Sequence, residues 1–139
     1  MLTPSRLLEI LSAIACLLVL AVAASIEPRP AGFGSHEDLG LEPCPYLRST
    51  GRPCPTCGMT TAFAAGVRLR LVDSFRANPA GLLLCLVAMA IPPWVLLSMR
   101  RGLPAVRVLS KWTPLTLLAA LFLVVFLAWA YKLASWPSA

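Results

Sequence analysis

The chain has 139 residues, of which 58% are hydrophobic and only 13% are charged, and its mean hydropathy is +0.78. Average soluble domains are about 45–50% apolar and about 25% charged. A soluble globule of this size could not cover so much apolar surface with so few polar side chains, and the same composition excludes intrinsic disorder. The net charge is +6, but no basic tract carries interleaved aromatic residues, so nucleic-acid binding is not expected. We therefore expect an integral membrane protein with one domain over residues 1–139.

The first apolar stretch covers residues 7–26. Its twenty residues would extend about 30 Å as a helix, which matches the hydrocarbon core of a bilayer. A signal peptide is the alternative, because Arg6 precedes the stretch and Ala21-Val22-Ala23 fits a signal-peptidase site. We favour the retained helix.

A long loop follows, over residues 27–78. Residues 27–41 are rich in proline and glycine and predict an irregular segment. The small apolar residues 59–66 predict a short helix, whose alanine-and-glycine face indicates either close contact with another helix or an interfacial helix. Residues 67–71 alternate as a strand would, but we expect them to lie at the membrane surface, with leucines in lipid and arginines snorkelling to water.

The second and third spans are predicted over residues 79–99 and 112–133. Asn78 can cap the second span, while Pro92 and Pro93 should kink it. Aromatic residues typical of membrane interfaces flank the third span: Trp112 at one end, and Trp129, Tyr131 and Trp136 at the other. The predicted fold is an all-α membrane protein with three transmembrane helices and a cysteine-containing loop and short interfacial helix between the first two.

The distribution of basic residues predicts the orientation. Residues 100–111 hold four basic residues and no acidic one, whereas loop 27–78 holds six basic residues among 52 together with five acidic ones. Because short cytoplasmic loops are enriched in lysine and arginine, we expect the N-terminus and the connector to be cytoplasmic. The cysteine loop and the C-terminus should then face outward.

Three of the five cysteines, Cys44, Cys54 and Cys57, lie in this loop, and Pro-Cys-Pro occurs there twice. The segment is short and rich in turn-forming residues, so we expect the three cysteines to converge. An odd cysteine count argues against a fully disulfide-paired framework. Cys16 and Cys85 lie in the spans and are expected to act as small hydrophobic residues.

Three kinds of chemistry fit these cysteines. Zinc or iron could bind the Cys-x-x-Cys-Gly knuckle through Cys44, Cys54 and Cys57, with His36 as the fourth ligand. Alternatively, Cys54 and Cys57 form a thiol–disulfide pair, because a helix N-terminus lowers the pKa of a nearby thiol. In the third interpretation, which we favour, Cys44 bonds Cys54 or Cys57 and staples the loop.

The run Cys44-Pro45, Thr50-Gly51, Pro53-Cys54-Pro55-Thr56-Cys57-Gly58-Met59-Thr60, Ala62-Phe63 and Asn78-Pro79 resembles the bacterial domain-of-unknown-function family 2752, roughly over residues 42–99. The resemblance implies a bacterial membrane setting, here the inner membrane, and supplies no activity. The family typically has arginine after the threonine of its Cys-Gly-x-Thr motif, where this chain has Thr61.

The predicted function is that of a non-catalytic accessory or scaffolding subunit, which contacts the lipid bilayer and other membrane-protein subunits and requires no cofactor. Three short spans, one of them kinked, make a poor sealed transporter, and no span carries a central charged residue. The alternatives are a membrane thiol–disulfide oxidoreductase that uses Cys54 and Cys57, and a metal-binding membrane module.

Overall fold

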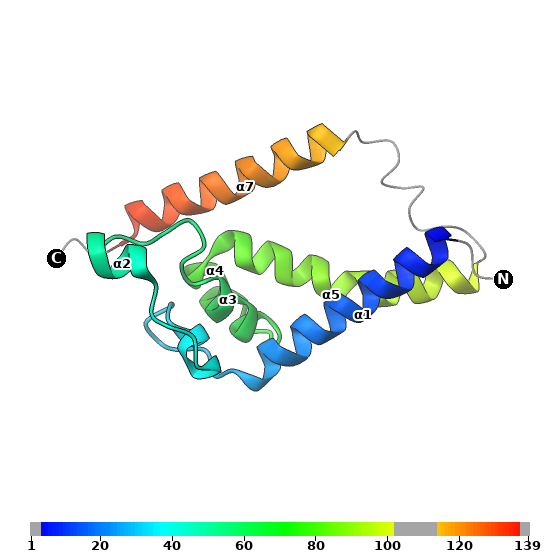
Figure 1. Cartoon of the computed structure of the whole chain (residues 1–139), viewed down its shortest axis with the longest axis horizontal. Coiled ribbons are helices and arrows are strands. Elements are labelled where there is room, and N and C mark those ends of the chain that lie inside the picture. The colour runs from blue at the N-terminus through cyan, green and yellow to red at the C-terminus, as the bar shows by residue number, and fades with distance from the viewer. Residues whose placement is uncertain (1–3, 102–113, 137–139) are drawn as a thin grey trace.

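The computed structural model describes residues 4–101 and 114–136. Three long helices, α1 (Pro4–Ser25), α5 (Pro79–Arg100) and α7 (Pro114–Ala134), frame a loop that holds four short ones (Figure 1). The short helices are η1 (Ser35–Leu39), α2 (Pro45–Thr50), α3 (Met59–Gly66) and α4 (Leu71–Ala77). Within the described residues, three helices are long and apolar enough to cross a membrane. The predicted all-α fold with three such helices is therefore confirmed, with boundaries within three residues of those expected.

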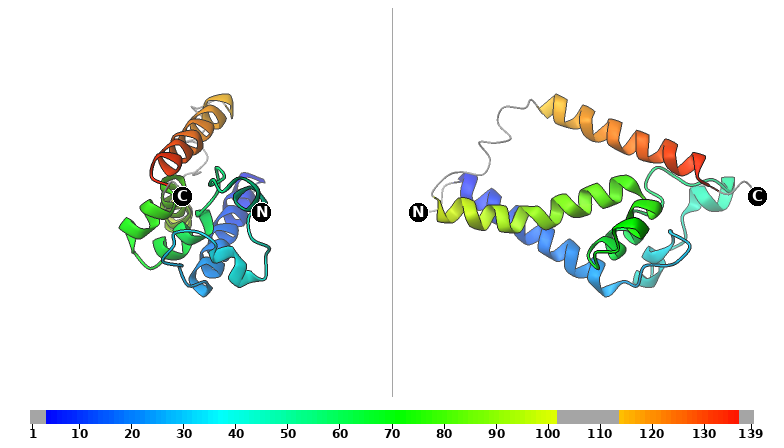
Figure 2. Two further views of the ribbon diagram at one scale, coloured as in Figure 1. Left: turned by 90° about the vertical axis from the view of Figure 1, so that its left-hand side faces the viewer. Right: turned by 180° about the vertical axis from the view of Figure 1, so that it is seen from behind.

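The long helices are packed unequally. α1 lies along α5, whereas α7 approaches the rest of the chain mainly at its C-terminal end (Figures 1 and 2). Large apolar side chains such as Leu18, Leu118 and Phe122 are exposed on these helices. Such surfaces are stable in lipid, because a helix satisfies its own backbone hydrogen bonds and lipid solvates the apolar side chains. Contact with the bilayer thus accounts for the exposed faces.

Helix α3 is buried between α1, α4 and α5. A Cβ atom added to Gly66 would lie 2.7 Å from the Cys85 sulfur, and one added to Gly81 would lie 2.7 Å from the Cβ atom of Ala62. Only glycine at these two positions allows α3 and α5 to lie this close together. Of the two alternatives for the small-residue face of residues 59–66, close contact with another helix is the one observed.

Helix α5 begins at the predicted cap. The Asn78 side-chain oxygen accepts a hydrogen bond from the Gly81 N–H at 3.0 Å, and its amide group donates to the Cys57 carbonyl at 3.1 Å. The helix continues through Pro92 and Pro93 and bends about midway (Figure 2). Asn78 therefore both starts a membrane-spanning helix and holds the cysteine loop against it.

The segment expected at the membrane surface forms a turn after α3. Leu69 adopts a positive φ of 58°, and the Arg70 N–H donates to the Ala65 carbonyl at 3.0 Å, which ends the helix. Arg68 points back to α1 and donates to the carbonyls of Ala23 and Ala24 at 3.4 and 3.0 Å. It thereby satisfies carbonyl groups that the end of a helix leaves without partners.

The predicted orientation can be tested by cysteine labelling. In a variant without native cysteines, Ser49→Cys places a thiol on the exposed helix α2, and Ser110→Cys places one in the basic connector. A membrane-impermeant maleimide is expected to label the first variant in intact cells and the second only after the membrane is permeabilised. The reverse pattern would contradict an outward-facing cysteine loop.

Candidate thiol site

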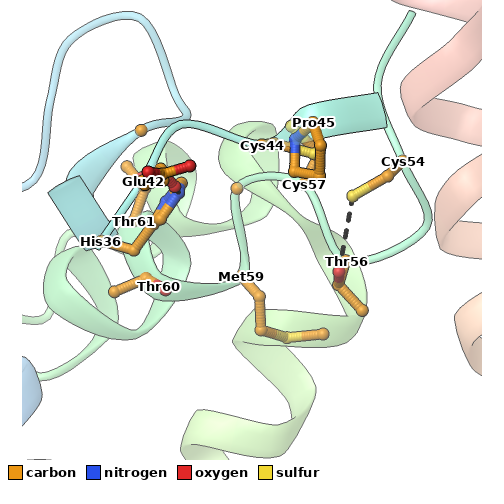
Figure 3. A pocket seen from close by; sticks show the side chains of 12 residues that line it. His36, Glu42, Cys44, Pro45, Cys54, Thr56, Cys57, Met59, Thr60 and Thr61 are labelled. Carbon is orange, nitrogen blue, oxygen red and sulfur yellow. Dashed lines mark hydrogen bonds between the residues drawn. The ribbon is translucent and has the colours of Figure 1, made fainter. Parts of the chain in front are cut away.

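The three loop cysteines line one cavity of about 310 Å³ (Figure 3). His36 and Glu42 lie at one end of it, and Cys54 with Thr56 lies at the other. The start of α3 also lines the cavity, with Met59, Thr60 and Thr61. The expected convergence of the cysteines is therefore observed, and all of them are free thiols in this structure.

Cys54 and Cys57 stand at the two ends of a single turn. The Cys57 N–H donates to the Cys54 carbonyl at 3.0 Å. Such a four-residue turn keeps its terminal Cα atoms within about 7 Å of each other, which is also close to the upper limit for a disulfide. The turn therefore brings the two thiols into a range where a bond between them requires little backbone movement.

The Cys54 sulfur is partly exposed and receives several hydrogen bonds. It lies 3.4 Å from the Thr56 hydroxyl, and the Cys44 side chain also hydrogen-bonds to it. Desolvation raises the pKa of the Cys54 thiol, but these hydrogen bonds, with those from the backbone N–H groups of Thr56 and Cys57, outweigh it and lower the pKa. Because the thiolate is the nucleophilic form of cysteine, the lowered pKa makes Cys54 the candidate nucleophile of the pair.

Cys57 has the opposite environment. The residue is only 7% exposed to solvent. Desolvation is the main reason that the pKa of its thiol is raised to about 11. The neighbouring sulfurs of Cys54 and Cys44 raise this pKa further, while the ammonium group of Lys132 opposes the change without cancelling it. Cys57 therefore has a raised pKa although it lies at the N-terminus of α3, and burial is the main cause.

Gly58 allows the turn to pass close to two other segments. It has a φ of +81°, and a Cβ atom there would overlap the Ala77 carbonyl oxygen and lie 2.6 Å from the Gly32 carbonyl oxygen. Both the left-handed conformation and the space require glycine. The end of α4 and the chain around Gly32 therefore lie in close contact with Gly58, the residue that follows Cys57.

The C-terminal part of α7 holds this arrangement together. The Trp129 indole N–H donates to the Pro53 carbonyl at 3.0 Å. The Lys132 ammonium group, on a residue only 6% exposed, donates to the carbonyls of Ala77 at 2.8 Å, Arg76 at 3.4 Å and Gly32 at 3.5 Å. A helix far along the chain thus fixes both the residue before Cys54 and the two carbonyls that contact Gly58.

The aromatic residues predicted as membrane anchors also contact the loop. Tyr131 pairs with Phe75 at a ring-centroid distance of 5.4 Å, and Trp136 pairs with Phe33 at 5.0 Å. Trp112 lies outside the described residues. Sequence reasoning missed the role of Lys132, although its spacing of three residues from Trp129 places both on one face of α7.

The proposed fourth metal ligand lies apart from the cysteine pair. The ring Nε2 of His36 is 3.1 Å from the Glu42 carbonyl oxygen, at the end of the cavity opposite Cys54 (Figure 3). Within residues 4–101 and 114–136, no group of three or more histidine, cysteine or acidic side chains is arranged to hold a metal ion. Zinc or iron binding by Cys44, Cys54, Cys57 and His36 stays a prediction.

Thr61, which stands where the resembling family has arginine, is 3% exposed. Its hydroxyl donates to the Ser35 hydroxyl at 2.9 Å, and that hydroxyl accepts from the Arg29 backbone N–H at 3.1 Å. An arginine side chain would displace Ser35 from this position. Where the family has arginine, this chain therefore has a threonine that is buried and hydrogen-bonded to Ser35 at the edge of the cavity.

Comparison with known proteins gives one match. The model of the family described as Protein of unknown function (DUF2752) matches residues 44–91. The resemblance to this family is therefore confirmed. The matched region contains all three loop cysteines, helices α2 to α4 and about half of α5. No curated protein and no solved structure matches the chain.

Proposed function

We propose that the protein carries out thiol–disulfide exchange at the membrane surface, with Cys54 as the nucleophile and Cys57 as the resolving thiol. The observation that carries this proposal is the difference between two cysteines of one turn. Cys54 is accessible and its pKa is lowered, whereas Cys57 is buried and its pKa is raised to about 11. An accessible thiol with a lowered pKa beside a buried, protonated thiol is the combination that an exchange reaction requires.

The reaction partner in this proposal is a disulfide of another protein. The Cys54 thiolate attacks one sulfur of that disulfide, a mixed disulfide forms, and the other partner sulfur leaves as a thiolate. Cys57 then gives its proton to this thiolate and attacks the Cys54 sulfur. The Cys54–Cys57 disulfide forms, and the second partner sulfur leaves Cys54 as a thiolate that takes a proton from water. The partner, having gained two electrons, is thereby released as a dithiol. The reverse sequence oxidises a partner dithiol.

The site supports the second step as well as the first. In the mixed disulfide Cys54 carries no charge, so one of the causes that raise the pKa of Cys57 is removed. The positive charge of Lys132 remains and favours the Cys57 thiolate. Cys44 stays hydrogen-bonded beside the pair, where it stabilises the Cys54 thiolate whenever that is released.

The setting of this activity is part of the proposal. The basic connector and the resemblance to a bacterial family support a bacterial inner membrane with the cysteine loop and the C-terminus facing outward. There the loop would meet the oxidising compartment in which protein disulfides persist.

A non-catalytic accessory or scaffolding subunit is the second candidate. It is favoured by the packing of α7, because only 11% of the apolar stretch of this helix is buried within the chain. Such a face can contact the helices of another membrane-protein subunit as well as lipid. In that function the cysteines would maintain the shape of the loop and would undergo no turnover.

Redox equilibration tests the exchange function. Purified protein in detergent is incubated with mixtures of reduced and oxidised glutathione, quenched with acid and alkylated with a mass-tagged maleimide. We expect one reversible disulfide. The variant Cys44→Ser should retain it, because a serine hydroxyl can still donate a hydrogen bond to Cys54. The variant Cys54→Ser should abolish it. A bridge that is lost in Cys44→Ser would instead identify a structural Cys44–Cys54 staple and would count against the proposal.

A further inference from the structure

A second cavity, of about 460 Å³, lies at the C-terminal end of α7 and contains none of the cysteines, although Lys132 belongs to both sites. Its volume falls within the range of about 300–1,000 Å³ that is typical of small-molecule sites. Two cationic side chains, three aromatic rings and one serine line it: Arg76, Lys132, Phe33, Tyr131, Trp136 and Ser135. Ala31 completes the lining, so no acidic side chain of the described residues is among them.

The two cations leave the cavity positively charged. Lys132 is held by three backbone carbonyls, which solvate its ammonium group but do not neutralise the charge. Arg76 is exposed on α4. Among the described residues, the ion pairs involve neither Arg76 nor Lys132. An anion would therefore be stabilised here, and the planar arginine could bind two of its oxygens at once.

The walls and the position of the cavity restrict the kind of anion. The Phe33 ring packs against Trp136 in a tilted arrangement, and the Lys132 ammonium group lies 5.6 Å from the centroid of the Trp136 ring. The cavity adjoins the last turn of a membrane-spanning helix, where tryptophan and tyrosine lie at the level of the lipid headgroups. Basic pockets beside transmembrane helices bind anionic headgroups.

We propose that this cavity binds the phosphate of an anionic phospholipid, with Arg76 contacting the phosphate oxygens and Lys132 supplying the second positive charge. The aromatic rings would surround the glycerol part of the headgroup. An occupied site would link α7 to two parts of the loop, α4 and the chain around Phe33.

The test compares lipids that differ in charge. The full-length protein is reconstituted in nanodiscs of phosphatidylcholine with or without phosphatidylglycerol, extracted, and its retained lipids are measured by native mass spectrometry. We expect selective retention of phosphatidylglycerol and a loss of about five-fold in Arg76→Gln. The matched control is Arg70→Gln, which removes the same charge from the other end of α4, where Arg70 is exposed and paired with Asp73 at 2.9 Å. This control should retain the lipid.

Three results would overturn the proposal. They are equal retention of both lipids, an equal loss in Arg70→Gln and Arg76→Gln, and binding of inorganic phosphate without retention of phosphatidylglycerol. The last result would assign the cavity to a soluble phosphate. A different result would support the proposal: millimolar inorganic phosphate displaces only part of the phosphatidylglycerol from the unmodified protein. The cavity would then contact the phosphate group, and the lipid would remain its ligand.

Discussion

Cys57→Ser is expected to accumulate as a mixed disulfide through Cys54. Without Cys57, nothing in the turn can attack the bond between Cys54 and a partner, so the first product of the exchange is trapped. The lowered pKa of Cys54 keeps its sulfur reactive in the variant, and its partial exposure keeps it accessible. Non-reducing gels of membranes quenched with acid should show a band of higher mass that disappears on reduction.

Two variants make this result specific. Cys54→Ser with Cys57 intact should give no trapped band, because the remaining Cys57 is buried and its pKa is raised to about 11. The double variant Cys54→Ser, Cys57→Ser should also lack the band, which excludes trapping through Cys44. The mass of the partner, read from the excised band, would identify the substrate.

The accessory function predicts a different outcome for the same variants. If the cysteines only maintain the shape of the loop through a staple, losing it would cost about 2–5 kcal/mol. Cys54→Ser would then lower the amount of protein in the membrane or its co-purification with other subunits, and Cys57→Ser would trap nothing. Normal accumulation of Cys57→Ser without any trapped band would count against thiol exchange.

The spans and the short helix over residues 59–66 were predictable because their signals are local, whereas η1, α2 and α4 were not predicted. A membrane-spanning helix needs about twenty apolar residues in a row, and the chain contains three such stretches. Asn78-Pro79 marks the start of α5 in the same local way, because asparagine caps and proline fits the first turn. Cys-x-x-Cys-Gly likewise indicated that Cys54 and Cys57 would lie together.

What distinguishes the two thiols was not predictable, because it depends on distant segments. Cys57 is buried, and Lys132 and Trp129 hold the chain on either side of its turn through hydrogen bonds that span 55 to 100 residues of sequence. Trp129 was interpreted as an interfacial anchor, which is the usual role of tryptophan at the end of a span. Only the folded chain shows that its indole N–H contacts Pro53, the residue before the reactive cysteine.

Gly58→Ala is expected to be the most destabilising single substitution in the loop. A residue with a side chain in the left-handed conformation costs about 1–2 kcal/mol, and Gly58 has a φ of +81°. The added methyl group would also meet the carbonyl oxygens of Ala77 and Gly32. Overpacking of this kind costs about 1–3 kcal/mol more, and here the obstacle is backbone that Lys132 holds from the other side.

Gly51→Ala is the matched control for this substitution. Gly51 ends α2 with a φ of +67°, and nothing lies within 4 Å of the position that its Cβ atom would occupy. It should therefore lose only the conformational part, about 1–2 kcal/mol, against about 2–5 kcal/mol for Gly58→Ala. Thermal unfolding in detergent compares the two, and alkylation of Cys57 in the folded state should accelerate only in Gly58→Ala. Equal effects of both substitutions would mean that the approach of Ala77 and Gly32 to Gly58 does not constrain the thiol site.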